Sequence, residues 1–413
     1  MKKIFVSAYA CEPGKGSEPG IGWNVVNQLS RYFEVHVLTR ANNREVIEEF
    51  YRENTADVQP FFHYYDLPRW LSFWKKKRRG YRLYYWLWQY FAFFKYRKFV
   101  NTFRFDLVQH LTFANFAVPS LFMFTKPVTV YGPIGVAGLN SAVFSGLPAK
   151  IKLRELFRKI VMWLLIHFDI CRFLTPYAAD YIIECGAEEH SSAFSEGLQK
   201  KIIRHPQTGI SLDDPEYRTS RRRADDGRVR LLICSEFLHW KGVTFACEVF
   251  CRIAQQRSNV ELVVCGSGPE EGNMRRILNN GNAADKVVFK GFVSKQEMFQ
   301  ELCDADILLY PSYHHGLATL ILQAMYAGLP IVCIKGDPVA LAVAEGAGAI
   351  ASGDSLSDII DDFTDKTLEL TDFPELRLQY GEKGRQLAVD KYDWKKMCEV
   401  LAGHLEDMME KRK

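Results

Sequence analysis

Short apolar runs recur along the chain, and each is followed by turn-forming residues and then by a segment with a helical pattern of apolar positions. Such runs are found at Lys3–Tyr9, Glu34–Thr39, Phe105–Gln109 and Val128–Tyr131, and again at Leu231–Cys234, Glu261–Cys265, Val287–Phe289 and Ile307–Tyr310. Runs of this length are typical of strands that are buried on both faces of a parallel sheet. Their alternation with helices predicts an α/β protein with doubly wound sheets.

The length and one polar segment predict two domains. The chain has 413 residues, which exceeds the roughly 250–300 residues at which a single core stops growing. Residues 206–228 have no hydrophobic period, and we interpret them as a linker. The first domain is then 1–205 and the second 229–390.

Charge is divided unevenly between the two halves. The net charge is +9 for residues 1–200 and −5 for residues 201–413, which sums to the +4 of the whole chain.

Residues 67–105 contain eleven Lys or Arg, no Asp or Glu and sixteen aromatic residues. Aromatic surface flanked by cations suits an anionic membrane interface. The alternative is an aromatic helix pair packed on the core with a solvated basic turn. Nucleic acid is not expected, because no recognised RNA or DNA module pattern accompanies the charge.

The remaining composition is that of a cytoplasmic protein. The segment 150–173 reads as an amphipathic helix, either a second membrane face or a cover of the domain core. Ten cysteines occur singly, without zinc spacing, which favours small core side chains in a reducing cytosol. No apolar run reaches about 18 residues, so we expect no membrane-spanning helix. The sequence therefore predicts a cytoplasmic protein that lies peripherally at the inner face of the membrane.

The stretch from Pro311 to Pro330 carries the candidate chemistry. It follows the expected strand Ile307–Tyr310, and Thr319–Ala327 has the apolar density of a helix packed on a sheet. In a parallel sheet, ligands sit at the carboxyl ends of strands, where a helix amino terminus presents N–H groups to an anion. The order strand, loop, helix predicts a ligand that carries phosphate.

The residues of this stretch resemble the motif of retaining glycosyltransferases of family 4, the glycosyl transferases group 1, which use sugar nucleotides. The residues in register are Pro311-Ser312, Gly316, Ala324-Met325, Ala327-Gly328 and Pro330. The resemblance is continuous from Leu231 to Ala349. It implies the GT-B fold, in which two Rossmann-like domains face each other across a cleft, with a last helix in 391–413 that returns to the first domain.

The resemblance implies roles for several residues of the second domain. The two family carboxylates fall on His315 and Gln323, neither of which is acidic here. His315 stands at the first of these positions, so the resemblance implies that it polarises the leaving group and the sugar, and we expect it to be catalytic. Together with His315, Gly316 and Leu317 would bind the donor at its sugar, and Gln323 would bind the ribose as acceptor and donor.

The diphosphate side of the motif is also recognisable. Lys241 matches the family lysine that holds the donor diphosphate, whereas Glu236 stands where the family has an arginine. Gly266 and Gly268 lie in a tight loop that is close to the nucleotide in the family.

Two glycine loops of the first domain, in 10–23 and 132–135, resemble a subset of the same family, and His110 matches a position of the family as a whole. Gly20 and Gly22 belong to a glycine-rich loop after the first strand, and a helix is expected from Trp23 to Tyr32. Glycine lets the backbone approach a ligand closely. His110 ends a strand where the family has a histidine near the donor sugar and the acceptor, and we expect it to be catalytic.

These observations favour a metal-independent enzyme that transfers a sugar, with retention, from a nucleotide diphosphate to a lipid-linked or cell-surface polysaccharide acceptor. No cofactor is expected, because fixed charge and the helix dipole would stabilise the leaving group. The alternative is a non-catalytic relative that acts as a binding or scaffolding subunit. The altered residues at positions 236, 315 and 323 keep that alternative open.

Overall fold

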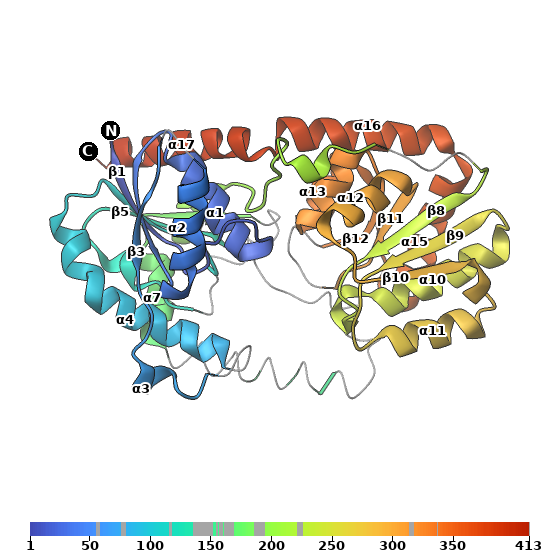
Figure 1. The fold of residues 1–413 in the computed structure, drawn as a ribbon, viewed down its shortest axis with the longest axis horizontal. Helices are drawn as coiled ribbons and strands as arrows, with labels where there is room; N and C mark the ends of the chain where they lie inside the picture. The colour runs from blue at the N-terminus through green and yellow to red at the C-terminus, as the bar shows by residue number, and fades with distance from the viewer. Residues whose placement is uncertain are drawn as a thin grey trace. The chain divides into compact units, whose positions relative to one another are not determined.

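The computed structural model of the chain forms two compact units. In Figure 1 the first unit is coloured from blue to green and includes the red helix α17 at the end of the chain, and the second unit is chiefly yellow to orange-red. The structure describes residues 1–54, 58–75, 80–114, 118–134, 152–153, 156, 160, 169–185, 195–220, 226–313, 318–336 and 338–412. The first unit is built from Met1–Val136, Leu153–Gly209 and Trp394–Lys413, and the second chiefly from Ile210–Asp393.

The first unit contains a parallel sheet of seven strands in the order β3-β2-β1-β4-β5-β6-β7. The strands are β1 (Lys3–Ser7), β2 (Glu34–Thr39), β3 (Phe61–Tyr64), β4 (Leu107–His110), β5 (Val128–Ile134), β6 (Tyr181–Glu184) and β7 (Ile202–Arg204). The helices are α1 (Ser17–Leu29), α2 (Arg44–Glu53), α3 (Arg69–Ser72), α4 (Tyr81–Thr102), α7 (Ile170–Ala178), α9 (Glu196–Gln199) and α17 (Trp394–Lys411).

The second unit contains a parallel sheet of six strands in the order β10-β9-β8-β11-β12-β13. The strands are β8 (Val229–Cys234), β9 (Val260–Cys265), β10 (Val287–Gly291), β11 (Ile307–Tyr310), β12 (Ile331–Ile334) and β13 (Gly348–Ala351). The helices are α10 (Val243–Gln256), α11 (Glu271–Asn280), α12 (Lys295–Asp304), α13 (Thr319–Ala327), α14 (Pro338–Ala344), α15 (Leu356–Asp372) and α16 (Pro374–Asp390). Both sheets confirm the doubly wound α/β prediction, and the strand order reverses between β8 and β11.

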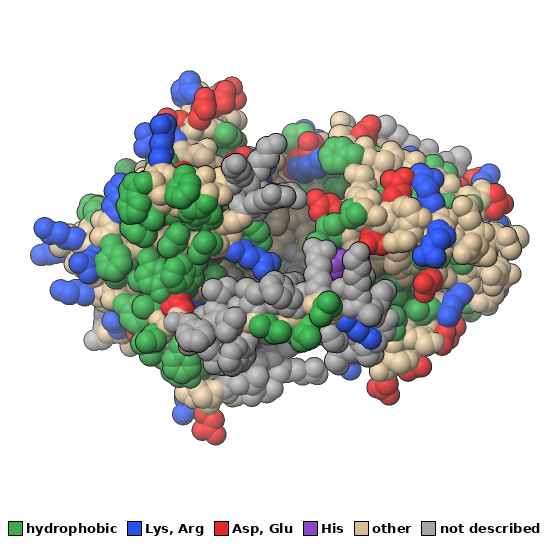
Figure 2. All heavy atoms as spheres, turned by 90° about the horizontal axis from the view of Figure 1, so that it is seen from below, with side chains coloured by type: hydrophobic (Ala, Val, Ile, Leu, Met, Phe, Trp, Pro, Cys, Tyr) green, Lys and Arg blue, Asp and Glu red, His purple; other side chains and the backbone are tan. Residues whose placement is uncertain are grey.

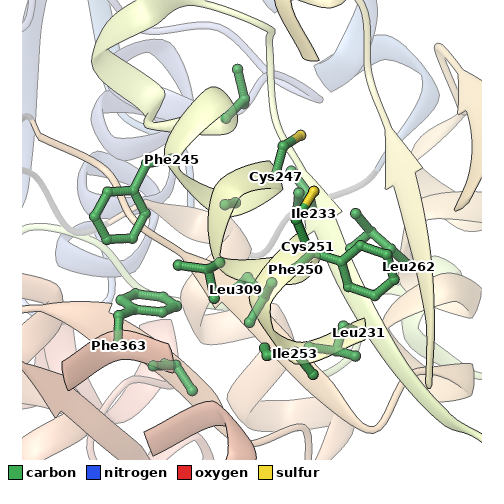
Figure 3. Packing of buried hydrophobic residues seen from close by; sticks show 14 of the residues in the cluster. Leu231, Ile233, Phe245, Cys247, Phe250, Cys251, Ile253, Leu262, Leu309 and Phe363 are labelled. Atoms are coloured by element: carbon green, nitrogen blue, oxygen red, sulfur yellow. The ribbon is translucent and has the colours of Figure 1, made fainter. Parts of the chain in front are cut away.

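Each sheet is buried on both faces by apolar side chains. In the second unit, α10 turns Phe250 and Ile253 onto β8 and β9, and Phe363 of α15 meets Phe245 edge to face (Figure 3). In the first unit, α1 and α17 cover one face, while α4 packs on the other through Tyr85 and Trp88. The last helix therefore belongs to the first unit.

Part of the segment expected to be a linker is packed in the second unit. The side chains of Ile210 and Tyr217 are buried among residues of α12, α13 and β11. The N–H of Ile210 donates to the carbonyl of Tyr392 at 2.8 Å. Ile210 and Tyr217 stand among short polar residues, so hydrophobic periodicity did not indicate that they are buried.

Two predicted helices have different bounds in the structure. The first begins at Ser17 rather than Trp23, so Gly20 and Gly22 are helical residues of α1 and not loop residues. The helix expected over 150–173 does not run through, because Asp169 has an extended backbone and its carboxylate accepts a hydrogen bond from the N–H of Arg172. Asp169 thus begins the separate helix α7. Most of residues 150–168 lie outside the described residues.

Gly22 has a packing reason to lack a side chain. A Cβ atom at this position would lie 2.1 Å from the carbonyl oxygen of Ala10 and 3.0 Å from the Thr112 side chain, whereas one at Gly403 of α17 would meet nothing within 4 Å. The glycine therefore lets α1 press against the loop that follows β1.

We expect Gly22→Ala to destabilise the protein by about 1–3 kcal/mol, because two backbone segments must move apart to admit a methyl group. Gly403→Ala is the matched control in another helix, and there alanine should be neutral or stabilise by up to about 1 kcal/mol. Urea unfolding of both variants measures the difference, and equal midpoints would contradict this packing role.

Candidate active site

Three loops meet at the carboxyl edge of the second sheet, where the strand order reverses. The loop after β8 is joined to the loop after β9 by the Phe237 N–H, which donates to the carbonyl of Ser267 at 2.9 Å. It is joined to the loop after β11 by the Tyr313 N–H, which donates to the carbonyl of Trp240 at 2.8 Å. This edge is the position at which open α/β sheets bind their ligands.

Glycines allow these loops to approach so closely. A Cβ atom at Gly266 would lie 1.9 Å from the Ser235 carbonyl oxygen, and one at Gly268 would lie 2.6 Å from that of Phe237. At Gly242 the backbone has a positive φ of 67°, which favours glycine, and the carbonyl oxygen of Pro311 would be 2.0 Å from a Cβ atom. Loop packing by itself therefore explains these glycines.

Lys241 is the last residue of a 3₁₀ turn, His239–Lys241, that leads through Gly242 into α10. Its side chain is half-buried, and no acidic residue occupies the first turn of α10. The helix amino terminus and the lysine thus add positive potential at one place. The side chain of Glu236, at the position of the family arginine, is exposed.

Gln323 lies in the second turn of α13 and is buried. Its Nε2 donates a hydrogen bond of 2.8 Å to the hydroxyl of Tyr217. Burial raises the pKa of Tyr217, so its hydroxyl stays protonated at neutral pH. His315, Gly316 and Leu317, the expected neighbours of Gln323 in the motif, lie outside the described residues.

His110 ends β4 and is enclosed inside the first unit, with only 1% of its surface exposed. Its Nε2 lies 3.1 Å from the carbonyl of Thr112, which can only accept, so Nε2 carries the proton. Nδ1 then accepts from the Ser120 hydroxyl at 2.6 Å, and the Tyr85 hydroxyl lies 3.0 Å from Nε2. The contacts of His110 are with the protein's own groups and fix the start of the loop after β4.

Glu18 is a candidate that the sequence reading did not single out. It lies in the first turn of α1, and its carboxylate accepts from the Phe113 N–H at 2.9 Å and from Gln207 Nε2 at 3.1 Å. Burial raises the pKa of this carboxyl group, against the effect of the two hydrogen bonds. An acidic residue inside the glycine-rich segment was the available signal, but its partners come from distant loops.

Among the described residues, no group of three or more His, Cys, Asp or Glu side chains is arranged to hold a metal ion.

Residues 214–387 match the family model described as "Glycosyl transferases group 1". This range contains Lys241, Gln323 and the three loops that meet at the carboxyl edge of the second sheet. The match covers most of the second unit, which is therefore similar to the glycosyl transferases group 1. The resemblance inferred from the motifs of this domain is thereby confirmed.

A curated relative supports the same assignment. The GDP-mannose-dependent monoacylated alpha-(1-6)-phosphatidylinositol monomannoside mannosyltransferase of Corynebacterium glutamicum is 26% identical over 173 residues, which are 40% of this chain and 44% of that protein. The chain spans about half the length of the curated relatives that it matches.

Solved structures extend the likeness to both units. Sucrose-phosphate synthase from Thermosynechococcus elongatus has a TM-score of 0.65 at 13% identity over 100% of both chains. HepE of Anabaena in complex with UDP and glucose has a TM-score of 0.59 at 14% identity, over 98% of this chain and 100% of that chain. These likenesses concern the fold alone, and they confirm the GT-B prediction.

The enclosure of His110 predicts a pH effect on stability. Burial lowers its pKa from 6.5 to about 4. As the pH falls below about 6.5, the unfolded chain binds a proton that the folded protein resists, so folding stability is present above this pH and is lost below it. Through this residue, lowering the pH from 7 to 5 should reduce the free energy of unfolding by about 2 kcal/mol.

Urea unfolding of the wild type and His110→Gln at both pH values measures the contribution. The variant should be less stable at pH 7 but should lose less stability on acidification. Parallel losses in the two proteins would show that His110 is not the group that resists the proton.

Proposed function

We propose that the protein is a retaining glycosyltransferase that moves a sugar from a nucleotide diphosphate to a lipid-linked or cell-surface glycan. The observation that carries the proposal is the meeting of three loops, Lys241 and the α10 amino terminus at one edge of the second sheet, inside the family-matched segment. A diphosphate leaving group develops negative charge, and fixed positive groups stabilise it without reorganisation.

On the donor side, Lys241 and the first turn of α10 bind the diphosphate, and Gln323 binds the ribose. Gly266 and Gly268 bring the loop after β9 close to the nucleotide. His315, Gly316 and Leu317 border the donor sugar, as the family motif implies. This division of roles requires neither a cofactor nor a metal.

On the acceptor side, His110 acts indirectly, through the loop that it supports. Its hydrogen bonds hold the loop after β4, and the Phe113 N–H in that loop binds Glu18. Glu18 and Gln207 then present polar groups at the carboxyl edge of the first sheet. Gly20 and Gly22 set the position of Glu18 by packing α1 against its preceding loop.

A non-catalytic binding or scaffolding subunit is the second candidate. The exposed carboxylate of Glu236 favours it, since that charge opposes a diphosphate. Saturation-transfer NMR with UDP-, GDP- and ADP-sugars separates the two functions. A glycosyltransferase contacts at least one of these donors specifically, whereas a subunit without a donor site contacts none.

Lys241→Ala should weaken binding of the donor found in this way by about 1.5–3 kcal/mol, because a charge-assisted contact with the diphosphate is lost. Titration calorimetry measures the change. Lys366→Ala is the matched control, since Lys366 pairs with Asp362 on α15. Equal affinities of wild type and Lys241→Ala would remove Lys241 from the diphosphate site.

An exposed apolar surface on the first unit supports a location at the membrane. The α7 side chains at i, i+3, i+4 and i+7 are exposed, with Ile170 at 72% and Phe173 at 59%. The Asp169 carboxylate accepts from Trp86 Nε1 at 2.5 Å and from the Tyr90 hydroxyl at 2.8 Å, which pins the start of α7 to α4. The anchor thereby leaves these apolar side chains outside the core.

Further exposed apolar side chains lie on or beside α3 and α4 (Figure 2), and basic side chains accompany them. We define the docking surface by the exposed apolar residues Trp70, Phe73, Tyr81, Leu83, Phe94, Ile170, Phe173, Leu174 and Tyr177. Lys95, Arg97 and Lys98 of α4 are exposed as well. This combination suits an anionic bilayer, and it would bring the first unit to a lipid-linked acceptor at the inner face of the membrane.

No helix among the described residues is long and apolar enough to cross a membrane.

The double variant Ile170→Ser, Phe173→Ser should reduce sedimentation with anionic liposomes even at high salt, because it removes apolar contact. Replacing Lys75, Lys76, Lys77, Arg78 and Arg79 with Gln should remove the part of binding that weakens with salt, since the Debye length falls from about 10 Å at 0.1 M to 3 Å at 1 M. Residues 76–79 lie outside the described residues.

Phe373→Ser controls for the loss of an exposed aromatic residue, because Phe373 is exposed between α15 and α16 of the second unit. It should sediment like the wild type. If all three variants bind anionic vesicles as the wild type does, the docking surface faces something other than lipid.

A further inference from the structure

Tyr217 and Gln323 form a buried polar pair in the second unit. They are 106 positions apart in the chain, and 7% and 3% of their surfaces are exposed. The carboxamide Nε2 of Gln323 donates to the Tyr217 hydroxyl at 2.8 Å. A buried pair of this kind is costly to leave unmade, so the contact fixes the Gln323 side chain.

The Tyr217 ring is held between two aromatic neighbours. Its centroid is 4.8 Å from that of Phe299 on α12 and 6.2 Å from that of Tyr326 on α13. The ring therefore cannot move without disturbing the packing of both helices. This leaves the hydroxyl in one place.

Ion pairs fasten the segment on which Tyr217 lies. Lys295, at the start of α12, binds Asp214 and Glu216 at 2.6 Å each. Its ammonium group also lies 5.2 Å from the centre of the Tyr217 ring. Asp214 in turn accepts from the N–H of Glu216 and begins the 3₁₀ turn Pro215–Tyr217. Contacts to the ring and ion pairs to the 3₁₀ turn thus both hold the Tyr217 side chain in place.

The chemistry of the Gln323 carboxamide explains why its orientation must be fixed. A carboxylate has two equivalent acceptor oxygens, whereas a carboxamide has one acceptor and one donor group and can face a ligand the wrong way. The bond from Nε2 to Tyr217 decides the orientation of Gln323. Oε1 is then the oxygen that can accept from a ligand hydroxyl.

We propose that Tyr217 is a positioning residue for ribose recognition, because it turns Oε1 of Gln323 toward a hydroxyl of a nucleoside diphosphate. The inference rests on the proposed function, in which Gln323 binds the ribose. It adds that this chain selects ribonucleotides over 2′-deoxyribonucleotides through a contact that Tyr217 orients.

Titration calorimetry with UDP, GDP and ADP first identifies the diphosphate that binds, and its 2′-deoxy form gives the ribose preference. In Tyr217→Phe the ring stays and only the hydroxyl is lost. We expect the ribose preference to fall about fivefold, the size of one hydrogen bond of roughly 1 kcal/mol. Affinity for the 2′-deoxy form should stay as in the wild type.

Two further variants make the test specific. Tyr326→Phe removes a hydroxyl from the same aromatic group and should keep the wild-type preference. Gln323→Glu restores two equivalent oxygens, so adding Tyr217→Phe to it should leave the ribose preference unchanged. That dependence on residue 323 is not expected if Tyr217 only supports the fold.

The outcomes separate the inference from the proposed function. Absence of binding by every nucleoside diphosphate to the wild type overturns the proposed function. Binding with an equal ribose preference in wild type and Tyr217→Phe overturns the inference alone. An equal loss of affinity for both forms of the nucleotide also overturns it, because the phenol then acts through the fold.

Discussion

Close backbone contact at the carboxyl edge of the second sheet is the constraint on which the candidate site depends. The loop that leads into α10 touches the Pro311 carbonyl at Gly242, and the loop after β9 touches the Ser235 carbonyl at Gly266. A Cβ atom at Gly242 would lie 2.0 Å from the Pro311 carbonyl oxygen and one at Gly266 would lie 1.9 Å from that of Ser235, so a side chain at either glycine would push two loops apart. The positions of Lys241 and of the α10 amino terminus follow from these contacts. The glycines of this motif, which resemble a ligand-binding signature, are therefore required in the first place for the packing of the loops.

At one position the candidate site has an oriented amide where the family motif has a charge. Where the family motif has carboxylates or an arginine, this chain has Gln323 and Glu236, and the first is locked by the Tyr217 hydroxyl. A neutral amide must be oriented to be useful, whereas a carboxylate need not be. The aromatic and ionic support around Tyr217 is consistent with that need. In the proposed function, Lys241 is the side-chain cation that binds the diphosphate.

The first unit is organised around buried polar groups. His110 has both ring nitrogens engaged and a pKa lowered to about 4 by burial, so it behaves as a neutral support of the loop after β4. Asp169 is a second buried polar support, since its carboxylate joins α7 to α4. Both residues are polar and buried. His110 supports the loop after β4 at the polar edge of the first sheet, and Asp169 holds the start of α7, whose apolar side chains are exposed.

The sequence by itself determined the layer architecture. Apolar runs mark strands that are buried on both faces, and β2, β11 and α13 have the predicted bounds because burial and helix propensity act over a few neighbouring residues. The resemblance to the family motif also singled out Lys241 and Gln323 as candidates, because such a motif is local in the chain. The prediction of a ligand that carries phosphate followed from the same local order of strand, loop and helix.

Only the tertiary structure decided how these residues are held. Gly22 looked like a loop residue until its contact with Ala10 placed it inside α1. Tyr217 lay in an expected linker, and Glu18 stood among glycines, yet both make their decisive contacts with residues about a hundred positions or more away. Hydrophobic period carries no record of such contacts. They arise when strand order brings distant loops to one sheet edge, and that order is set by packing of the whole unit.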